Sequence, residues 1–383
     1  MNQQKITISQ GGRTSREQPA SIVKVPSSEP KRLSRNGSRP PMSQLHVASE
    51  VAPASWNDSL RAVHGTIFHT VAWANSVAAE QPGIRPDFYT MMDDDGSVAG
   101  MAVGFRATSS RNMTAAFSRR RWLDALPAVR GRSVTDVSRF VGLIERDSQL
   151  AGDITFRVGS FASPGGEPVL RSLGYSIAHR LEFELDLTKD EKSLWDGVDI
   201  KRRQRIKKAM KASIEVKELP VDEGVLHLRR LQEASFVRIA ARGGPSLNKK
   251  ESSTRDPITA LTSAGLGRIV GGFVDGECVT ASFFTTFNGL AYHALSGHDA
   301  KALATQAPSL VLWESVLRFQ REGFERLNFG GCGIDALNED SPEHGVYTYK
   351  KAFGGARLDC ASGEKVLRPT VRRVTNFLRR VVR

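Results

Sequence analysis

The stretch RIVGGFVDGECVTASFFTTFNGLAYHALSG, residues 268–297, decides the fold of this chain. Asp-Gly at 275–276 and Asn-Gly at 288–289 separate three runs that are rich in β-branched and aromatic residues. Such dipeptides favour tight turns between paired strands. The stretch therefore predicts an antiparallel meander of three strands.

The segments around the meander predict a mixed α/β unit over residues 188–362. Pro308 opens a predicted helix over SLVLWESVLRFQREG (309–323). The other expected elements are, in chain order, a helix over 193–212, a strand over IEVKEL (214–219), a helix over 222–241, a polar loop over 243–256, a strand over RLNFGG (326–331), a helical stretch near 345–353 and a last strand.

The preceding residues, 46–187, predict a first unit of the same class. Its expected elements are helical segments over 56–80, strands over 88–92 and 98–107, a helix over 133–150, a strand over ITFRVGSF (154–161), a short helix ending at Leu173 and a strand over SIAHRLEFELDL (176–187). The fold class is therefore α/β with mixed sheets, in two successive units.

Composition excludes several classes of protein. The chain has 383 residues, of which 40% are hydrophobic and 25% charged, with a mean hydropathy of −0.31. These values exclude a wholly disordered, a collagen-like or a membrane-spanning protein. Three cysteines (Cys278, Cys332 and Cys360) indicate neither a disulfide framework nor a cysteine-rich zinc site, and no secretory signal opens the sequence. We expect a cytoplasmic protein.

The basic charge lies at the two ends of the chain. The formal net charge is +13, and residues 1–45 and 364–383 each contribute +6, which leaves the body close to neutral. This distribution weakens the case for nucleic acid, and no stable nucleic-acid partner is expected. Residues 1–45 predict a disordered basic arm, suited to membrane or polyanion contact or only to solubility. Residues 363–383 predict a basic amphipathic helix that either contacts a membrane surface or packs on the body.

The run KRRQRIKKAMK, residues 201–211, contains seven basic residues among eleven. Few acidic residues stand four positions away to pair with them, so their mutual repulsion favours an anionic ligand. Phosphates suit the planar donors of arginine and the point charge of lysine. A solvated basic face is the alternative, and the pattern alone leaves both open.

Together with YTYKKAFGG (347–355), these features resemble the Fem-type family. That family comprises the peptidoglycan-bridge aminoacyl transferases and their acetyltransferase-like relatives, built on the GNAT (N-acetyltransferase) fold. The similar segments are LWDGVDIKRRQRIKKAMKASIEVKEL (194–219), LAYHALSGHD (290–299), GFERLNFGG (323–331), IFHTVAWANSVAAEQPG (67–83) and LRSLGYSIAHRLEFELDL (170–187). The resemblance covers about residues 50–362 and implies two tandem GNAT-like units, of which the second is catalytic.

The resemblance implies acyl transfer to an amine, and it suggests roles for matching residues. Lys350 would contact a phosphate or the developing oxyanion. Tyr349 and Tyr347 would pack the site or protonate a leaving group. His293 would relay a proton, unless it is simply a hydrogen-bonded core residue.

The matching basic helix would bind phosphates of the donor or acceptor through Arg202, Arg203, Arg205 and Lys208. In the GNAT fold a splayed strand pair offers a backbone N–H to the oxyanion, and the next helix receives the donor's pyrophosphate at its start, here near Pro308 or Ser309. Asp299 would orient the loop before it. No Ser-His-Asp order, His-x-x-x-His or carboxylate pair stands out, so we expect no metal.

One segment departs from the GNAT pattern. The usual glycine-containing pyrophosphate loop is replaced by HDAKALATQAPSL (298–310), which has alanines and no glycine. The donor therefore stays open between an acyl-CoA and an aminoacyl-tRNA, each as co-substrate rather than as a tightly bound cofactor. The expected acceptor is an amine on a cell-envelope or polysaccharide precursor. A lipid-linked precursor would place the protein at the inner face of the membrane. The rival hypotheses are an acetyl-CoA-dependent acetyltransferase of a small amine or protein lysine, and a non-catalytic module tethered to membrane or nucleic acid.

Overall fold

The computed structural model describes residues 44–80, 83–107, 119–241 and 257–374, all within one compact unit that starts at Pro41. Most of the predicted basic arm, the predicted loop 243–256 and the chain after residue 374 lie outside these ranges. No helix of the described residues is long and apolar enough to cross a membrane.

The first half of the described chain contains seven strands and several helices; four of the strands were predicted, and those over residues 44–49, 120–123 and 128–129 were not. The strands are β1 (Gln44–Ser49), β2 (Ile84–Met92), β3 (Val98–Ala107), β4 (Arg120–Leu123), β5 (Ala128–Val129), β6 (Thr155–Val158) and β7 (Ser176–Asp186). The helices are α1 (Trp56–Ala62), the 3-10 turn η1 (Ile67–His69), α2 (Val71–Glu80), α4 (Val134–Leu150) and α5 (Gly166–Ser172).

The second half contains the predicted meander and the long helix that follows it. The strands are β8 (Glu215–Glu218), β9 (Gly267–Val274), β10 (Glu277–Phe287), β11 (Leu290–His298), β12 (Arg326–Gly333) and β13 (Ala356–Val366). The helices are α6 (Glu191–Gly197), α7 (Ile200–Lys211), α8 (Val221–Ala240), α9 (Pro257–Ser263), α10 (Ala300–Thr305), α11 (Ala307–Arg321), the 3-10 turn η2 (Ile334–Leu337) and α12 (His344–Lys351).

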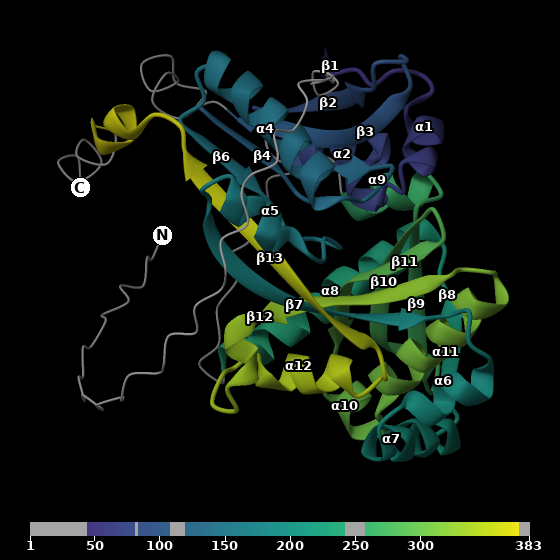
Figure 1. Cartoon of the computed structure of the whole chain (residues 1–383). Coiled ribbons are helices and arrows are strands. Elements are labelled where there is room, and N and C mark those ends of the chain that lie inside the picture. Colours follow the sequence, from purple (N-terminus) through teal and green to yellow (C-terminus); the bar gives the residue numbers. More distant parts are fainter. Residues whose placement is uncertain (1–43, 81–82, 108–118, 242–256, 375–383) are drawn as a thin grey trace, which may run out of the picture. The chain divides into compact units, whose positions relative to one another are not determined.

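All the described strands join one 13-stranded mixed sheet (Figure 1). Its order is β1-β2-β3-β4-β6-β13-β7-β12-β11-β10-β9-β8, with β5 paired to β3. The last strand, β13, therefore lies between β6 and β7 of the first half, and it pairs antiparallel with both. The sheet is continuous across the expected boundary at residues 187 and 188.

Three details differ from the sequence predictions. The helix expected over 193–212 is two helices, because the first ends at Gly197 and Asp199 then caps α7 by accepting hydrogen bonds from the Lys201 and Arg202 N–H groups. Gln44 and Leu45, assigned to the arm, begin β1 and pair with β2. Residues 363–366, assigned to the C-terminal helix, end β13, and only residues 369–374 of that segment are described as helical.

Each half has its own core, and a third core joins them. In the first half, Phe140 of α4 and Phe156 of β6 anchor one apolar cluster. In the second, Trp313 of α11 and Phe329 of β12 anchor another. The third cluster packs α1 and α2 against α8, α9 and the opposite face of the meander. Covering a sheet on both faces buries its backbone groups within paired strands.

We predict that residues 46–187 expressed alone do not fold. The fragment lacks β13, which pairs with β6 and β7, and it exposes the α1–α2 half of the joint core. Circular dichroism during heating should show no cooperative transition for the fragment and a cooperative one for the whole chain. A fragment that melts cooperatively with native-like strand content would contradict this expectation.

Candidate functional site: the opening between β11 and β12

The central strands β11 and β12 diverge soon after they begin. They pair in parallel at only three positions, Leu290 with Arg326, Ala291 with Leu327 and Tyr292 with Asn328. Beyond these positions β11 follows β10, while β12 follows β7. The ladder between the two central strands thus ends at Tyr292 and Asn328, and an opening begins there.

A β-bulge marks the β11 side of this opening. Phe283 pairs with Leu295 and the next residue, Phe284, pairs with His293, so Ala294 is an extra residue in β11. A bulge bends its strand and interrupts the regular pairing. Here the bend leads β11 away from β12 just past the last paired position.

Two glycines form the β12 side of the opening. Gly330 has φ +67°, a conformation that favours glycine, and a Cβ there would meet the His293 carbonyl oxygen at 2.9 Å and Lys350 Nζ at 3.2 Å. Its N–H donates to Asn328 Oδ1 at 2.7 Å. A Cβ on Gly331 would clash with the Leu181 carbonyl of β7. Both glycines therefore permit a close approach of β12 to its surroundings.

The carboxylate of Glu182, on β7, lies fully buried beneath the apex of the opening. It accepts hydrogen bonds from Tyr292 Oη (2.9 Å), Asn328 Nδ2 (2.9 Å), the Ala162 N–H (3.1 Å) and Arg180 Nε (3.3 Å). A buried charge is tolerated when it is fully hydrogen-bonded and paired, as this one is. The carboxylate therefore fixes β11 and β12 at the point where they diverge. Burial and the neighbouring Glu182 raise the pKa of the Tyr292 phenol well above its usual value, so the phenol remains the donor.

Lys350, on α12, extends its amine to the β12 side of the opening. Nζ donates to the Gly331 carbonyl oxygen at 3.1 Å. Burial, and then the nearby Arg180 guanidinium, lower the pKa of Lys350 to about 8. At neutral pH this amine is therefore mostly protonated, but its neutral fraction, about one molecule in ten, is far larger than that of an ordinary surface lysine.

His293 lies on β11 opposite the same amine. Its ring stacks on Phe284 with a centroid separation of 4.9 Å, and Nε2 has no hydrogen-bond partner among the described residues. Burial, with a further contribution from the Lys350 charge, lowers the pKa of His293 to about 3. The imidazole is therefore neutral at physiological pH. The structure thus brings the predicted residues Lys350 and His293 together at the opening.

A second group of predicted residues joins three helices. Arg202 of α7 is buried and donates to Ser309 Oγ of α11 at 2.8 Å. Its guanidinium lies over the ring of Tyr349 at 4.3 Å, and Tyr349 Oη donates to the Pro308 carbonyl oxygen at 3.0 Å. Burial raises the pKa of Tyr349 to about 12, so the phenol keeps its proton. Arg202 thus contacts both Ser309 and Tyr349.

The remaining predicted cations lie at the surface of α7. Arg203 is half-buried and pairs with Asp196 at 3.6 Å, while Arg205 is exposed. Lys208 is exposed and donates to the Ala304 carbonyl oxygen at 3.2 Å, at the end of α10. Arg205 and Lys208 therefore remain accessible to an external anion, whereas Arg202 is not.

The segment expected to depart from the usual pyrophosphate loop is helical. Residues 300–305 form α10, and Asp299 caps it by accepting from the Ala302 N–H at 2.8 Å. Gln306, at φ +64°, then links α10 to α11. The alanines of this segment thus form a helix where a glycine cradle would otherwise lie.

Comparison with known proteins identifies the fold that has this geometry. Residues 201–351 match the family model described as an acetyltransferase (GNAT) domain. FemX aligns with a TM-score of 0.69 at 10% identity, over 86% of this chain and 99% of its own. The chain has the Fem-type GNAT fold.

Two further solved structures share the fold at lower similarity. L-PGS from Bacillus licheniformis aligns with a TM-score of 0.51 at 13% identity, over 86% of this chain and 98% of its own. A conserved protein of unknown function from Bacteroides thetaiotaomicron aligns with a TM-score of 0.52 at 10% identity, over 85% of this chain and 100% of its own. No curated protein matches the sequence. The predicted fold is thus confirmed.

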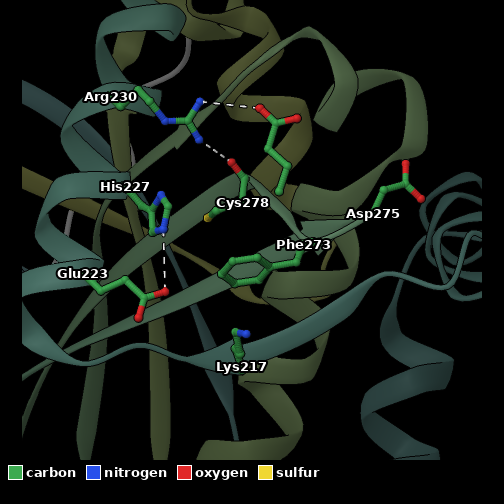
Figure 2. A pocket seen from close by; sticks show the side chains of 9 residues that line it. Lys217, Glu223, His227, Arg230, Phe273, Asp275 and Cys278 are labelled. Carbon is green, nitrogen blue, oxygen red and sulfur yellow. Dashed lines mark hydrogen bonds and ion pairs between the residues drawn. The ribbon is translucent and has the colours of Figure 1, made fainter.

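Two surface hollows lie apart from the GNAT opening. The larger, about 720 Å³, lies where α8 meets β8, β9 and β10 (Figure 2). Its cations have partners within it: Lys217 lies 4.2 Å over the Phe273 ring, His227 is 3.6 Å from Glu223, and Arg230 donates to the Cys278 carbonyl oxygen. Each of these three cations thus already has a contact within the hollow. The smaller hollow, about 450 Å³, lies between α6, α7 and α11.

The described residues contain no group of three or more His, Cys, Asp or Glu side chains that could hold a metal ion. The three cysteines lie buried and unpaired with one another.

Sequence reasoning missed Glu182, Asn328 and Arg180. Their only signal was a glutamate between the apolar residues of LEFELDL, which by itself predicts an exposed side chain.

We predict that Glu182→Gln lowers both the stability of the fold and the pKa of Lys350. The amide replaces one acceptor oxygen by a donor, so either the Ala162 and Asn328 donors, which share Oε2, or the Tyr292 and Arg180 donors, which share Oε1, lose their acceptor, at a cost of about 1–3 kcal/mol. The Glu182 charge raises the pKa of Lys350, so its loss should move that pKa further below 8. Urea unfolding measures the first effect, and NMR titration of ¹³C-methylated lysines measures the second. An unchanged Lys350 titration would show that the carboxylate does not act on the amine.

We predict that two arginines on the same helix differ in how much they contribute to the stability of the fold. Arg202→Ala should destabilise the fold by about 1–3 kcal/mol, because it leaves Ser309 without its partner and uncovers the Tyr349 ring. Arg205→Ala, at an exposed site on the same helix, should stay within about 0.5 kcal/mol. Denaturant unfolding compares the two variants, and equal losses would contradict the assignment.

Proposed function

We propose that this protein transfers an acyl group, and preferentially an aminoacyl group, from an activated donor to an amine at the opening between β11 and β12. The observation that carries the proposal is the juxtaposition of diverging central strands with the Lys350 amine. The GNAT domain match and the Fem-type fold support acyl transfer in general.

The residues at the opening suit the proton movements of this reaction. A neutral acceptor amine attacks the acyl carbonyl, a C–N bond forms, and the C–O or C–S bond to the carrier breaks. The proton lost by the attacking nitrogen must reach the leaving oxygen or sulfur. A lysine with a pKa of about 8 can accept and pass on such a proton near neutral pH.

The opening also suits the charge that develops in the transition state. Beyond Tyr292 the pairing of β11 with β12 has ended, so backbone N–H groups at this edge can point toward the carbonyl oxygen. The charged form of Lys350 lies across the same opening. His293, which stays neutral, would accept or donate a hydrogen bond without adding charge.

The start of α11 offers little to a pyrophosphate. Pro308 has no N–H, and the Ser309 N–H already donates to the Gln306 carbonyl oxygen at 3.0 Å. At the start of α10, the Asp299 carboxylate occupies the position that an anion would need. These features favour aminoacyl-tRNA over an acyl-CoA as donor, because its phosphates can lie on the exposed cations of α7.

The second candidate keeps the same chemistry with another donor. A CoA-dependent acetyltransferase is favoured by the description of the matching domain.

The acceptor, in line with the Fem-type resemblance, would be an amine on a cell-envelope or polysaccharide precursor. Contact of residues 364–383 with the inner face of a membrane would suit a lipid-linked acceptor.

Ligand-dependent thermal unfolding tests the donor. The full chain would be melted with acetyl-CoA, free CoA, aminoacyl-tRNA and uncharged tRNA. A ligand at 100 times its dissociation constant adds about 2.7 kcal/mol of stability, which is a readable shift. We expect the largest shift with aminoacyl-tRNA and its loss in Arg205→Ala/Lys208→Ala. A shift with acetyl-CoA alone would establish the second candidate. No shift with any donor would overturn acyl transfer in favour of a binding module.

Substitution of Lys350 tests the mechanism. Lys350→Ala should lower the transfer rate by about 100-fold or more, the usual size of a general acid–base contribution. Lys350→Arg should not restore it, since a guanidinium does not lose its proton near neutral pH. The adjacent, exposed Lys351→Ala is the matched control and should stay within about twofold. Equal rates for the Lys350 variants and the control would exclude a role for this amine.

A further inference from the structure

We propose that the outer face of α6 and α7 docks on an anionic membrane surface. This face, called the α6–α7 face below, consists of Lys192, Trp195, Ile200, Lys207, Met210 and Lys211. It combines lysines with exposed apolar side chains around the smaller hollow.

The geometry of α7 separates this face from the buried one. The buried side chains are Arg202, Ile206 and Ala209, which point into the second-half core or toward α11. Ile200, Lys207 and Lys211 are spaced by seven and four residues and so share the opposite face. The Ile200 residue is 64% exposed, so it is available for contact on this face.

An apolar groove continues this face toward α6. It has a volume of about 450 Å³ and is lined by Glu191, Lys192, Trp195, Lys207, Met210 and Trp313. The Trp195 ring lies 4.9 Å from the buried Trp313 ring, and the Lys207 amine lies 6.0 Å over Trp195. Met210, at its border, is 47% exposed. Indole rings flanked by lysines are typical of surfaces that lie at the headgroup level of a bilayer.

The charge of this face indicates which kind of partner binds there. Two acidic residues lie nearby: Glu191 lines the groove, and Asp196 pairs with Lys192 at 2.6 Å and with Arg203 at 3.6 Å. The helix α7 itself contains seven basic residues and no acidic one, so cations still outnumber acids around this face. The chain's own terminal segments, residues 1–45 and 364–383, each carry +6 and would be repelled. An external polyanion is therefore the complementary partner.

The apolar residues distinguish a membrane from a nucleic acid. Against RNA, Ile200 and Met210 would face a charged backbone and gain nothing. Against an anionic bilayer, lysines contact lipid phosphates while apolar side chains enter the boundary of the acyl region. Arg205 and Lys208, which the proposed function uses, lie on the side of α7 toward α10. The two uses of the helix are thus independent.

Fluorescence quenching by brominated lipids tests this contact. The full chain would be mixed with vesicles of phosphatidylcholine, with and without 30% phosphatidylglycerol, in which a fraction of the acyl chains carries bromine. The chain has five tryptophans, none of them in the terminal segments, so quenching reports contact of the folded body. We expect quenching only with phosphatidylglycerol, and its loss in Trp195→Phe. Vesicle binding without quenching would show that the termini alone bind, and would overturn the proposal.

Two double variants separate charge from apolar contact. Lys207→Gln/Lys211→Gln should weaken vesicle binding by about 25-fold, because each lysine near an anionic surface contributes about a fivefold factor. Ile200→Ser/Met210→Ser should weaken binding at unchanged charge. The matched control, Arg171→Gln/Arg357→Gln, removes two exposed cations elsewhere and should stay within about twofold.

Three results would overturn the proposal. One is an equal loss of binding in the control. Another is retention of binding in both α6–α7 variants, and the third is tRNA competition that removes the Trp195 quenching. A change of oligomeric state in the α6–α7 variants, seen by light scattering, would instead assign the face to a second copy of the chain.

Discussion

The buried carboxylate of Glu182 is the constraint on which the candidate site depends. A charge without solvent contact is stable only if donors surround it, and here the four donors come from β7, β11, β12 and the loop before α5. The carboxylate therefore sets where β11 and β12 meet and where they diverge. Gly330, which lies next to the Lys350 amine, comes two residues after Asn328, one of the donors to this carboxylate.

Both halves of the chain contribute to this constraint. Phe68, from the first half, packs edge-on against Tyr292 with a centroid separation of 5.1 Å and stacks on Phe161. Arg180 lies over the Phe161 ring at 5.1 Å, so the loop before α5 also shields the carboxylate from water. The first half is thus a wall of the site in the second, which gives a physical reason for their continuous sheet.

Local patterns predicted much of the fold. Turn dipeptides and runs of β-branched residues located the meander, and a proline at the start located α11, because these signals lie within a few residues of the element they define. The position of β13 between β6 and β7 could not be predicted, since it depends on pairing across nearly 200 residues. The break between α6 and α7 depends on Asp199 acting as a cap, which competes locally with a continuous helix.

The candidate site was predicted in the same uneven way. Lys350 and His293 were found through a motif, and the structure brings them together. Glu182 was missed because alternation along LEFELDL places it on the face opposite Leu181 and Phe183, which predicts exposure. It is buried because the side chains of Tyr292 and Asn328 and the loop before α5 contact it on that face, and only tertiary structure shows such contacts.

The basic run of α7 illustrates why composition cannot assign function to a charge. Arg202 is buried between three helices, where it contacts Ser309 and Tyr349, and Arg203 pairs with Asp196. Arg205 and Lys208 remain accessible toward α10, while Lys207 and Lys211 point away from the body beside apolar residues. The cations of this one run thus lie in three different environments. The helical repeat and the neighbouring helices decide which environment each side chain enters.

The helix α10 affects which acyl donor the protein can bind. A glycine loop would present several backbone N–H groups to a pyrophosphate, whereas in α10 the Ala302 N–H already donates to the Asp299 carboxylate. The phosphates of a donor must then find side chains instead of backbone, and the accessible side chains at this end of α7 are Arg205 and Lys208. Side-chain cations hold phosphates with less geometric selectivity than a backbone cradle does. They therefore suit a donor whose phosphates extend along a polynucleotide better than one with a single pyrophosphate.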